Sequence, residues 1–90
     1  MSQAIVDPNE LRRFAQNLKK FNQELEERMT SLRAQLHSLG ATWRDQEHKK
    51  FTEDFEEQMK VVARYMEVTN EHAPFLLRKA ERIEEYLQQR

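Results

Sequence analysis

The apolar residues in the first half of the chain recur every three or four positions. This stripe comprises Leu11, Phe14, Leu18, Phe21, Leu25, Met29, Leu32, Leu36 and Leu39. Because this spacing keeps side chains on one face of an α-helix, it predicts one long amphipathic helix over about residues 8–39. Asp7 and Pro8 mark its start, since Asp is a favoured N-cap residue and Pro is favoured at the first helical position.

A second stripe with the same spacing runs almost to the end of the chain. It comprises Phe51, Phe55, Met59, Val62, Met66, Thr69, Ala73, Leu76, Ala80, Ile83 and Leu87. The stripe predicts a second helix over about residues 44–88. Pro74 lies inside it and removes one backbone donor, so we expect a kink near residues 70–74. The stripe keeps its phase across Pro74, which favours one bent helix over two separate helices.

A short turn over residues 40–43 is predicted between the two helices. Gly40 follows the first stripe, where a helix often ends in the left-handed conformation. Thr42, with Asp45 three residues later, predicts the N-cap and capping box of the second helix. The fold class is therefore all-α, with a single domain over residues 1–90 that forms a hairpin of two long antiparallel helices.

The small size of the chain predicts an assembly. A chain of 90 residues buries only about 60–65% of its unfolded surface, and this chain has no cysteine to add a disulfide. The two stripes are also too wide to be covered by one hairpin, so we expect dimerisation into a four-helix bundle, with an identical copy or a related hairpin. The expected dimer surface comprises Phe14, Leu18, Leu25, Leu32, Phe55, Met59, Val62 and Met66.

Catalytic and metal-binding patterns are weak in this sequence. Adjacent glutamates such as Glu26 and Glu27 point about 100° apart around a helix, and no phosphate loop or nucleophile motif is present. We therefore expect neither an enzyme nor a cofactor. Asp45 and His48 have the spacing of a helical ligand pair, but one pair does not complete a metal site. His48 is expected to be solvated, away from the stripe that begins at Phe51.

The distribution of charged residues indicates neither a nucleic-acid partner nor a membrane partner. The formal net charge is -1, and the basic residues alternate with acids in a way that suits i, i+4 pairs on exposed helix faces. We expect no binding of nucleic acid and no stable membrane insertion. The first residues lack the basic and apolar blocks of a cleavable signal, so we expect a protein made in the cytoplasm without a signal peptide.

Trp43 is the only tryptophan and lies in the predicted turn. The residue alone has two interpretations. A large ring at this position can plug the open end of the hairpin, or it can project into the pocket of a partner.

Several short segments together carry a family resemblance: residues 5–8 (Ile-Val-Asp-Pro), Leu39-Gly40, residues 43–45 (Trp-Arg-Asp), and Phe51 eight residues after the tryptophan. With the length and the two stripes, they make the chain similar to the WXG family of small ESAT-like proteins, the substrates of type VII secretion systems. The chain departs from the family pattern at two places. Asp45 stands where the family has glycine, and Arg90 stands where the family's export signal has an acid four residues after a tyrosine, here Tyr86.

The resemblance implies a function in protein interaction and export. It implies a substrate or partner of a type VII secretion system, with a secretion ATPase as a further partner and with Trp43, Asp45 and Tyr86 as the recognition residues. An alternative of a different class is a cytoplasmic structural or adaptor helical bundle that is not exported. A metal-binding helical bundle is a third alternative.

Overall fold

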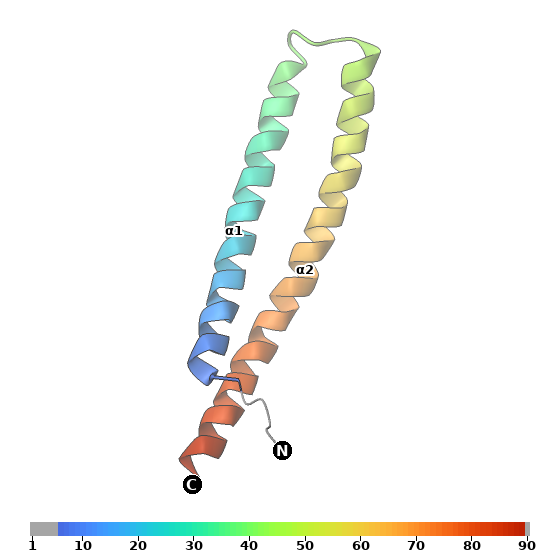
Figure 1. Ribbon diagram of the computed structural model, residues 1–90. Helices are drawn as coiled ribbons and strands as arrows, with labels where there is room; N and C mark the ends of the chain where they lie inside the picture. Colours follow the sequence, from blue (N-terminus) through green and yellow to red (C-terminus); the bar gives the residue numbers. More distant parts are fainter. Residues whose placement is uncertain (1–5, 90) are drawn as a thin grey trace.

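The computed structural model describes residues 6–89, which form two helices, α1 (Pro8–Leu39) and α2 (Gln46–Gln88). The helices are antiparallel and make a long hairpin with the turn at one end and both termini at the other (Figure 1). The predicted all-α hairpin is therefore confirmed. Its extents are 68 × 22 × 17 Å and its radius of gyration is 20.3 Å, whereas a compact chain of this length has a radius of about 12 Å. Each residue thus faces either the other helix or the outside.

The start of α1 follows its sequence signals. Asp7 has an extended backbone, and its carboxylate accepts a hydrogen bond of 2.8 Å from the backbone N–H of Asn9. Pro8 occupies the first turn, where its missing N–H costs nothing because that group has no partner within a helix.

The end of α1 differs from the prediction. Gly40 has φ -61° and ψ -17°, so the expected left-handed cap is wrong. The N–H groups of Gly40, Ala41 and Thr42 each bond to a carbonyl three residues earlier. This tighter winding ends the helix without a positive φ angle.

The start of α2 also differs from the prediction. Asp45 is the N-cap, with an extended backbone and a carboxylate that accepts from the His48 N–H at 3.1 Å. The helix therefore begins at Gln46, two residues later than expected. The predicted cap, Thr42, instead donates its hydroxyl to the Leu39 carbonyl at the end of α1.

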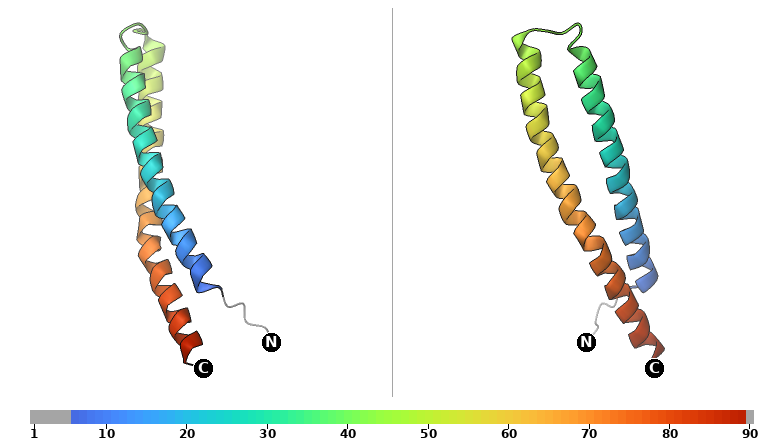
Figure 2. Two further views of the ribbon diagram at one scale, coloured as in Figure 1. Left: turned by 90° about the vertical axis from the view of Figure 1, so that its left-hand side faces the viewer. Right: turned by 180° about the vertical axis from the view of Figure 1, so that it is seen from behind.

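α2 continues through Pro74 without interruption. The two helices curve together along their length (Figure 2). They lie side by side at the turn in Figure 1, whereas the perpendicular view separates them near the termini, so the helices cross each other.

A narrow seam of buried residues holds the two helices together. It comprises Ala15, Asn22, Met29 and Leu36 on α1, and Met66, Ala73 and Ala80 on α2. Neighbouring members on each helix are seven residues apart, the repeat of a coiled coil. The seam buries only part of the predicted apolar stripes. Phe14 and Phe21, for example, are 59% and 51% exposed. Ala15, which is not a member of the predicted stripe, is completely buried.

Asn22 is a polar residue in the middle of this seam. It is 2% exposed, and its amide nitrogen donates to Thr69 Oγ1 at 2.8 Å and to Asn70 Oδ1 at 2.9 Å. Its own Oδ1 has no hydrogen-bond partner within the described residues. A buried polar group of this kind commonly fixes the register of a helix pair at a cost in stability.

Candidate protein-interaction site

Large apolar side chains remain exposed on both helices. Phe14, Phe21 and Tyr65 each precede a seam residue by one position, so each lies about 100° from the seam in the same rotational sense. Because the helices are antiparallel, this rotation brings both sets to the same side of the hairpin. The helical repeat places three further residues about 60° from the seam in the same sense: Leu32, Leu39 and Phe51. All six side chains are more than 45% exposed. We call this side the apolar face.

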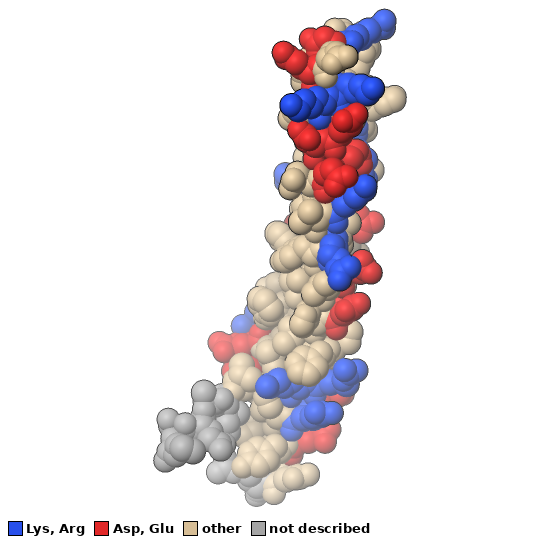
Figure 3. All heavy atoms as spheres, turned by 90° about the vertical axis from the view of Figure 1, so that its right-hand side faces the viewer, with Lys and Arg blue, Asp and Glu red and all other residues tan. Residues whose placement is uncertain are grey.

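Charged groups are distributed unevenly around the hairpin. In Figure 3 they cover the turn end and follow one edge, whereas a continuous band of uncharged atoms occupies the other edge through the middle of the molecule. The accessible surface is 7727 Å², compared with about 5,600 Å² for a compact monomer of this mass. The excess is more than the roughly 800 Å² that each partner buries in a standard protein interface.

The residues expected at a dimer surface fall into three groups. Phe14 and Leu32 are exposed, and Met66 is buried between the helices of one chain. Met66 therefore belongs to the intrachain seam, and we leave it out of the proposed partner surface. The others are half-buried and border the apolar face: Leu18, Leu25, Phe55, Met59 and Val62.

Trp43 is held at the turn by backbone and ring contacts. Its backbone N–H donates to the Leu39 carbonyl at 2.7 Å. Its indole meets the His48 ring edge to face, with centroids 4.9 Å apart and planes at 72°, and lies 6.2 Å from the Phe51 ring. The side chain is half-buried, so it packs on α2 and remains reachable from outside.

His48 is not solvated, and that expectation is wrong. The residue is half-buried, and its Nε2 lies 3.2 Å from the Leu36 carbonyl oxygen on α1. Its position explains the error: His48 precedes Phe55 by seven residues, which is two helical turns, so it lies on the seam side of α2. That spacing is the sequence signal that could have placed it.

The Asp45 carboxylate accepts the hydrogen bond that caps α2, as described above. Its backbone has φ -87° and ψ -178°, which any residue can adopt. The turn therefore does not require glycine at position 45. Asp45, Trp43 and His48 line a pocket of about 940 Å³ between the end of α1 and the start of α2, whose other charged or titratable members are Arg33, His37, Arg44, Lys49 and Glu56.

Tyr86 lies at the opposite end of the molecule. It is 61% exposed on the last turns of α2, about 60 Å from the turn at the helical rise of 1.5 Å per residue. One chain therefore does not bring Tyr86 together with Trp43 and Asp45. Arg90, the other residue compared with the export signal, lies outside the described residues.

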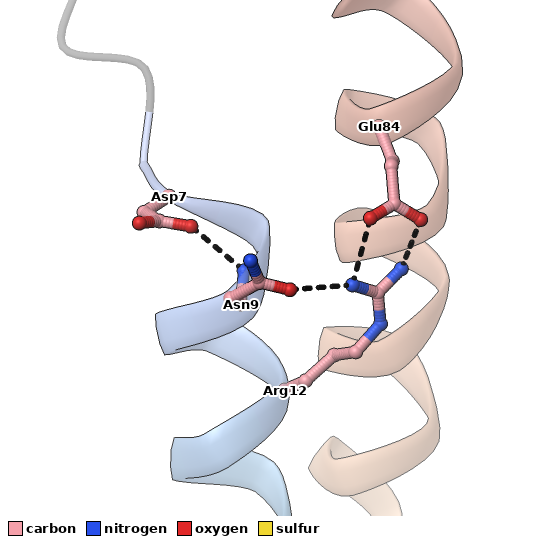
Figure 4. A network of polar contacts seen from close by, with 4 residues as sticks. All are labelled: Asp7, Asn9, Arg12 and Glu84. Carbon is pink, nitrogen blue, oxygen red and sulfur yellow. Dashed lines mark hydrogen bonds and ion pairs between the residues drawn. The ribbon is translucent and has the colours of Figure 1, made fainter. Parts of the chain in front are cut away.

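An ion pair joins the helices near the termini (Figure 4). Arg12 donates from both terminal nitrogens to the Glu84 carboxylate, at 2.6 and 3.0 Å, and also to Asn9 Oδ1. These hydrogen bonds lower the pKa of Glu84 and raise that of Arg12. The sequence pattern had assigned Arg12 to pairs within one helix, which is wrong. Near the turn, a second ion pair joins the helices, in which the Arg33 Nε donates to both oxygens of the Glu56 carboxylate, at 2.9 and 3.2 Å.

Two further kinds of site would need a cluster of metal ligands or a helix that could span a membrane. Among residues 6–89, no group of three or more His, Cys, Asp or Glu side chains could hold a metal ion. Neither α1 nor α2 combines the length and apolar character needed to cross a membrane.

Comparison with family models gives one match. The model described as WXG100, proteins of 100 residues with WXG, matches residues 3–86, nearly the whole chain. Comparison with curated proteins and with solved structures gives no match.

Proposed function

Because the chain belongs to the WXG100 family, we propose that it is a protein-interaction module that pairs with a second helical hairpin and is a substrate or partner of a type VII secretion system. The family match carries the assignment to secretion. The apolar face carries the assignment to pairing, since a cluster of large exposed apolar side chains commonly marks an interaction site.

The proposed partner surface consists of the apolar face and the half-buried residues that border it. A second hairpin is the natural occupant because its own narrow seam leaves an equivalent face unpaired, and two such faces close a four-helix bundle. The second hairpin is an identical copy or a related chain.

The proposed recognition residues are Trp43 and Asp45 at the turn and Tyr86 at the far end of α2. Trp43 is suited to recognition because aromatic side chains are frequent binding hot spots and this one keeps part of its surface accessible. Tyr86 is suited because its ring is exposed. A secretion ATPase is the proposed reader of these residues.

Two measurements test the proposal. Sedimentation equilibrium of the purified protein should give a dimer at micromolar concentration, and a stable monomer that pairs with no related hairpin would disprove the pairing. Export should be measured in cells that carry a type VII system, with Trp43→Ala beside the wild type. A wild-type protein that dimerises but stays inside those cells would instead support the unexported adaptor.

A further inference from the structure

We propose that His48 is a positioning residue that fixes the Trp43 indole against the start of α2. This inference rests on the proposed recognition role of Trp43 and adds the residue that gives the ring its orientation. His48 acts through two contacts, one with the backbone of α1 and one with the indole.

The contact with α1 fills a place left by the way that helix ends. In a continued α-helix the N–H of Gly40 would bond to the Leu36 carbonyl, but here it bonds to the His37 carbonyl. The His48 Nε2 lies 3.2 Å from the Leu36 oxygen. A carbonyl oxygen only accepts, so Nε2 carries the proton and donates. The side chain of α2 thereby caps α1 and cannot turn freely.

Gly40 lies beside this imidazole. A Cβ atom built on Gly40 would lie 3.4 Å from the His48 Cε1 and 3.1 Å from the His37 oxygen. The φ angle of Gly40 is ordinary for any residue, so the tight contact with the His37 carbonyl oxygen is what disfavours a larger residue here, while the His48 ring lies at ordinary van der Waals distance.

The contact with Trp43 follows from the first one. With the imidazole held by the Leu36 carbonyl, its edge-to-face contact fixes the plane of the indole, which also lies 6.2 Å from the Phe51 ring. Edge-to-face aromatic pairs favour a defined geometry. A pre-oriented anchor loses less conformational entropy when a partner binds, so the His48 contact supports recognition without touching the partner.

The experiment compares His48→Ala and His48→Gln with His72→Ala, an exposed histidine on the same helix. Trp43 is the only tryptophan, so its fluorescence reports this site alone. We expect both His48 variants to lose fluorescence anisotropy and to gain accessibility to acrylamide, with helicity retained, whereas His72→Ala behaves as wild type. Long-range ¹H–¹⁵N NMR of the wild type should find the proton of His48 on Nε2.

Export separates this proposal from the proposed function. The His48 variants should be exported as poorly as Trp43→Ala. Unchanged anisotropy and quenching in both His48 variants would overturn the positioning role, whatever export does. If Trp43→Ala is exported normally while the His48 variants still loosen the indole, the positioning contact stands and the recognition role of Trp43 fails. Should His48→Ala unfold, the same comparison is made with His48→Gln.

Discussion

The Arg12 guanidinium binds the Glu84 carboxylate through both terminal nitrogens, across 72 residues of sequence. This bidentate pair joins the first turns of α1 to the last turns of α2, where helix ends otherwise fray. In this arrangement two parallel, charge-assisted hydrogen bonds fix the orientation of both groups, which makes the interaction stronger than a single hydrogen bond between neutral groups.

The Arg12–Glu84 pair predicts a pH dependence at the terminal end of the hairpin. The pKa of Glu84 is lower in the folded state than in the unfolded chain because Arg12 donates to its charged form. Its stabilising effect is therefore complete above the unfolded value of about 4.3 and is lost as the pH falls through the lower folded value. Protection of the amides at the start of α1 against hydrogen exchange, taken relative to the intrinsic exchange rate at each pH, should fall over that acid range in the wild type. In Glu84→Gln this protection should be lower at neutral pH and less dependent on pH.

The neighbouring Glu85→Gln is the matched control, since Glu85 is exposed and its substitution leaves both partners of the Arg12–Glu84 pair in place. Equal exchange in Glu84→Gln and Glu85→Gln would show that the ion pair does not hold this end together.

The buried position of Asn22 predicts that even an isosteric substitution there strongly lowers the stability of the fold. Asn22→Asp replaces the donating amide with a carboxylate that faces the Thr69 and Asn70 oxygens in a buried seam. It should lower the free energy of unfolding by about 3 kcal/mol or more, as for an uncompensated buried charge. Urea denaturation measures the loss, and Asn17→Asp, at an exposed position of α1, should change little. Similar midpoints for the two variants would contradict the buried position of Asn22.

The alanines of the seam predict a steric limit. Ala73 is 1% exposed, so Ala73→Leu forces extra atoms between packed helices and should cost about 1–3 kcal/mol. Ala63→Leu makes the same change at an exposed position of α2 and should remain within about 0.5 kcal/mol of wild type. Chemical denaturation compares the two. A stabilised Ala73→Leu protein would mean that the helices are farther apart there than the burial indicates.

The apolar face predicts how the proposed dimer can be separated from the fold. Phe21→Asp places a charge on that face and should weaken pairing by about 2 kcal/mol or more, as at a binding hot spot. Gln16→Asp adds the same charge on the opposite side of α1 and should pair normally. Sedimentation equilibrium reads pairing and circular dichroism reads helicity. Normal pairing of Phe21→Asp would place the interface elsewhere.

The end of the sequence predicts a gain of export. Arg90 stands where the family's export signal has an acid four residues after a tyrosine, so Arg90→Glu should be exported better than the wild type. Gln89→Glu adds the same charge at the wrong spacing and should not. The amount of protein in the medium of cells with a type VII system decides between them. Equal export of both variants would separate Tyr86 from any such signal.

Local signals predicted the helices well, since apolar spacing and the Asp7 cap act over a few residues. The division of each stripe was not predictable in the same way. Whether Phe14 or Ala15 faces the other helix depends on the rotation of both helices together, and size alone favours the wrong one. Competing caps at Thr42 and Asp45 differ only in which side chain reaches a free N–H. The Arg12–Glu84 pair has no local signal, because its members meet only after the chain has turned back.

The seven-residue spacing of the seam also restricts how the length of this protein can change. Deletion of one residue within α1 would rotate all that follows by about 100°, so that the side now facing α2 would face outward. A deletion before Asn22 or after it would therefore misalign one part of α1 with α2. The interaction lost would be either the hydrogen bond from Asn22 to Thr69 or the contact of His48 with the Leu36 carbonyl. Insertions and deletions should therefore be tolerated in whole heptads, matched on both helices, and the length of the molecule should vary among relatives in steps.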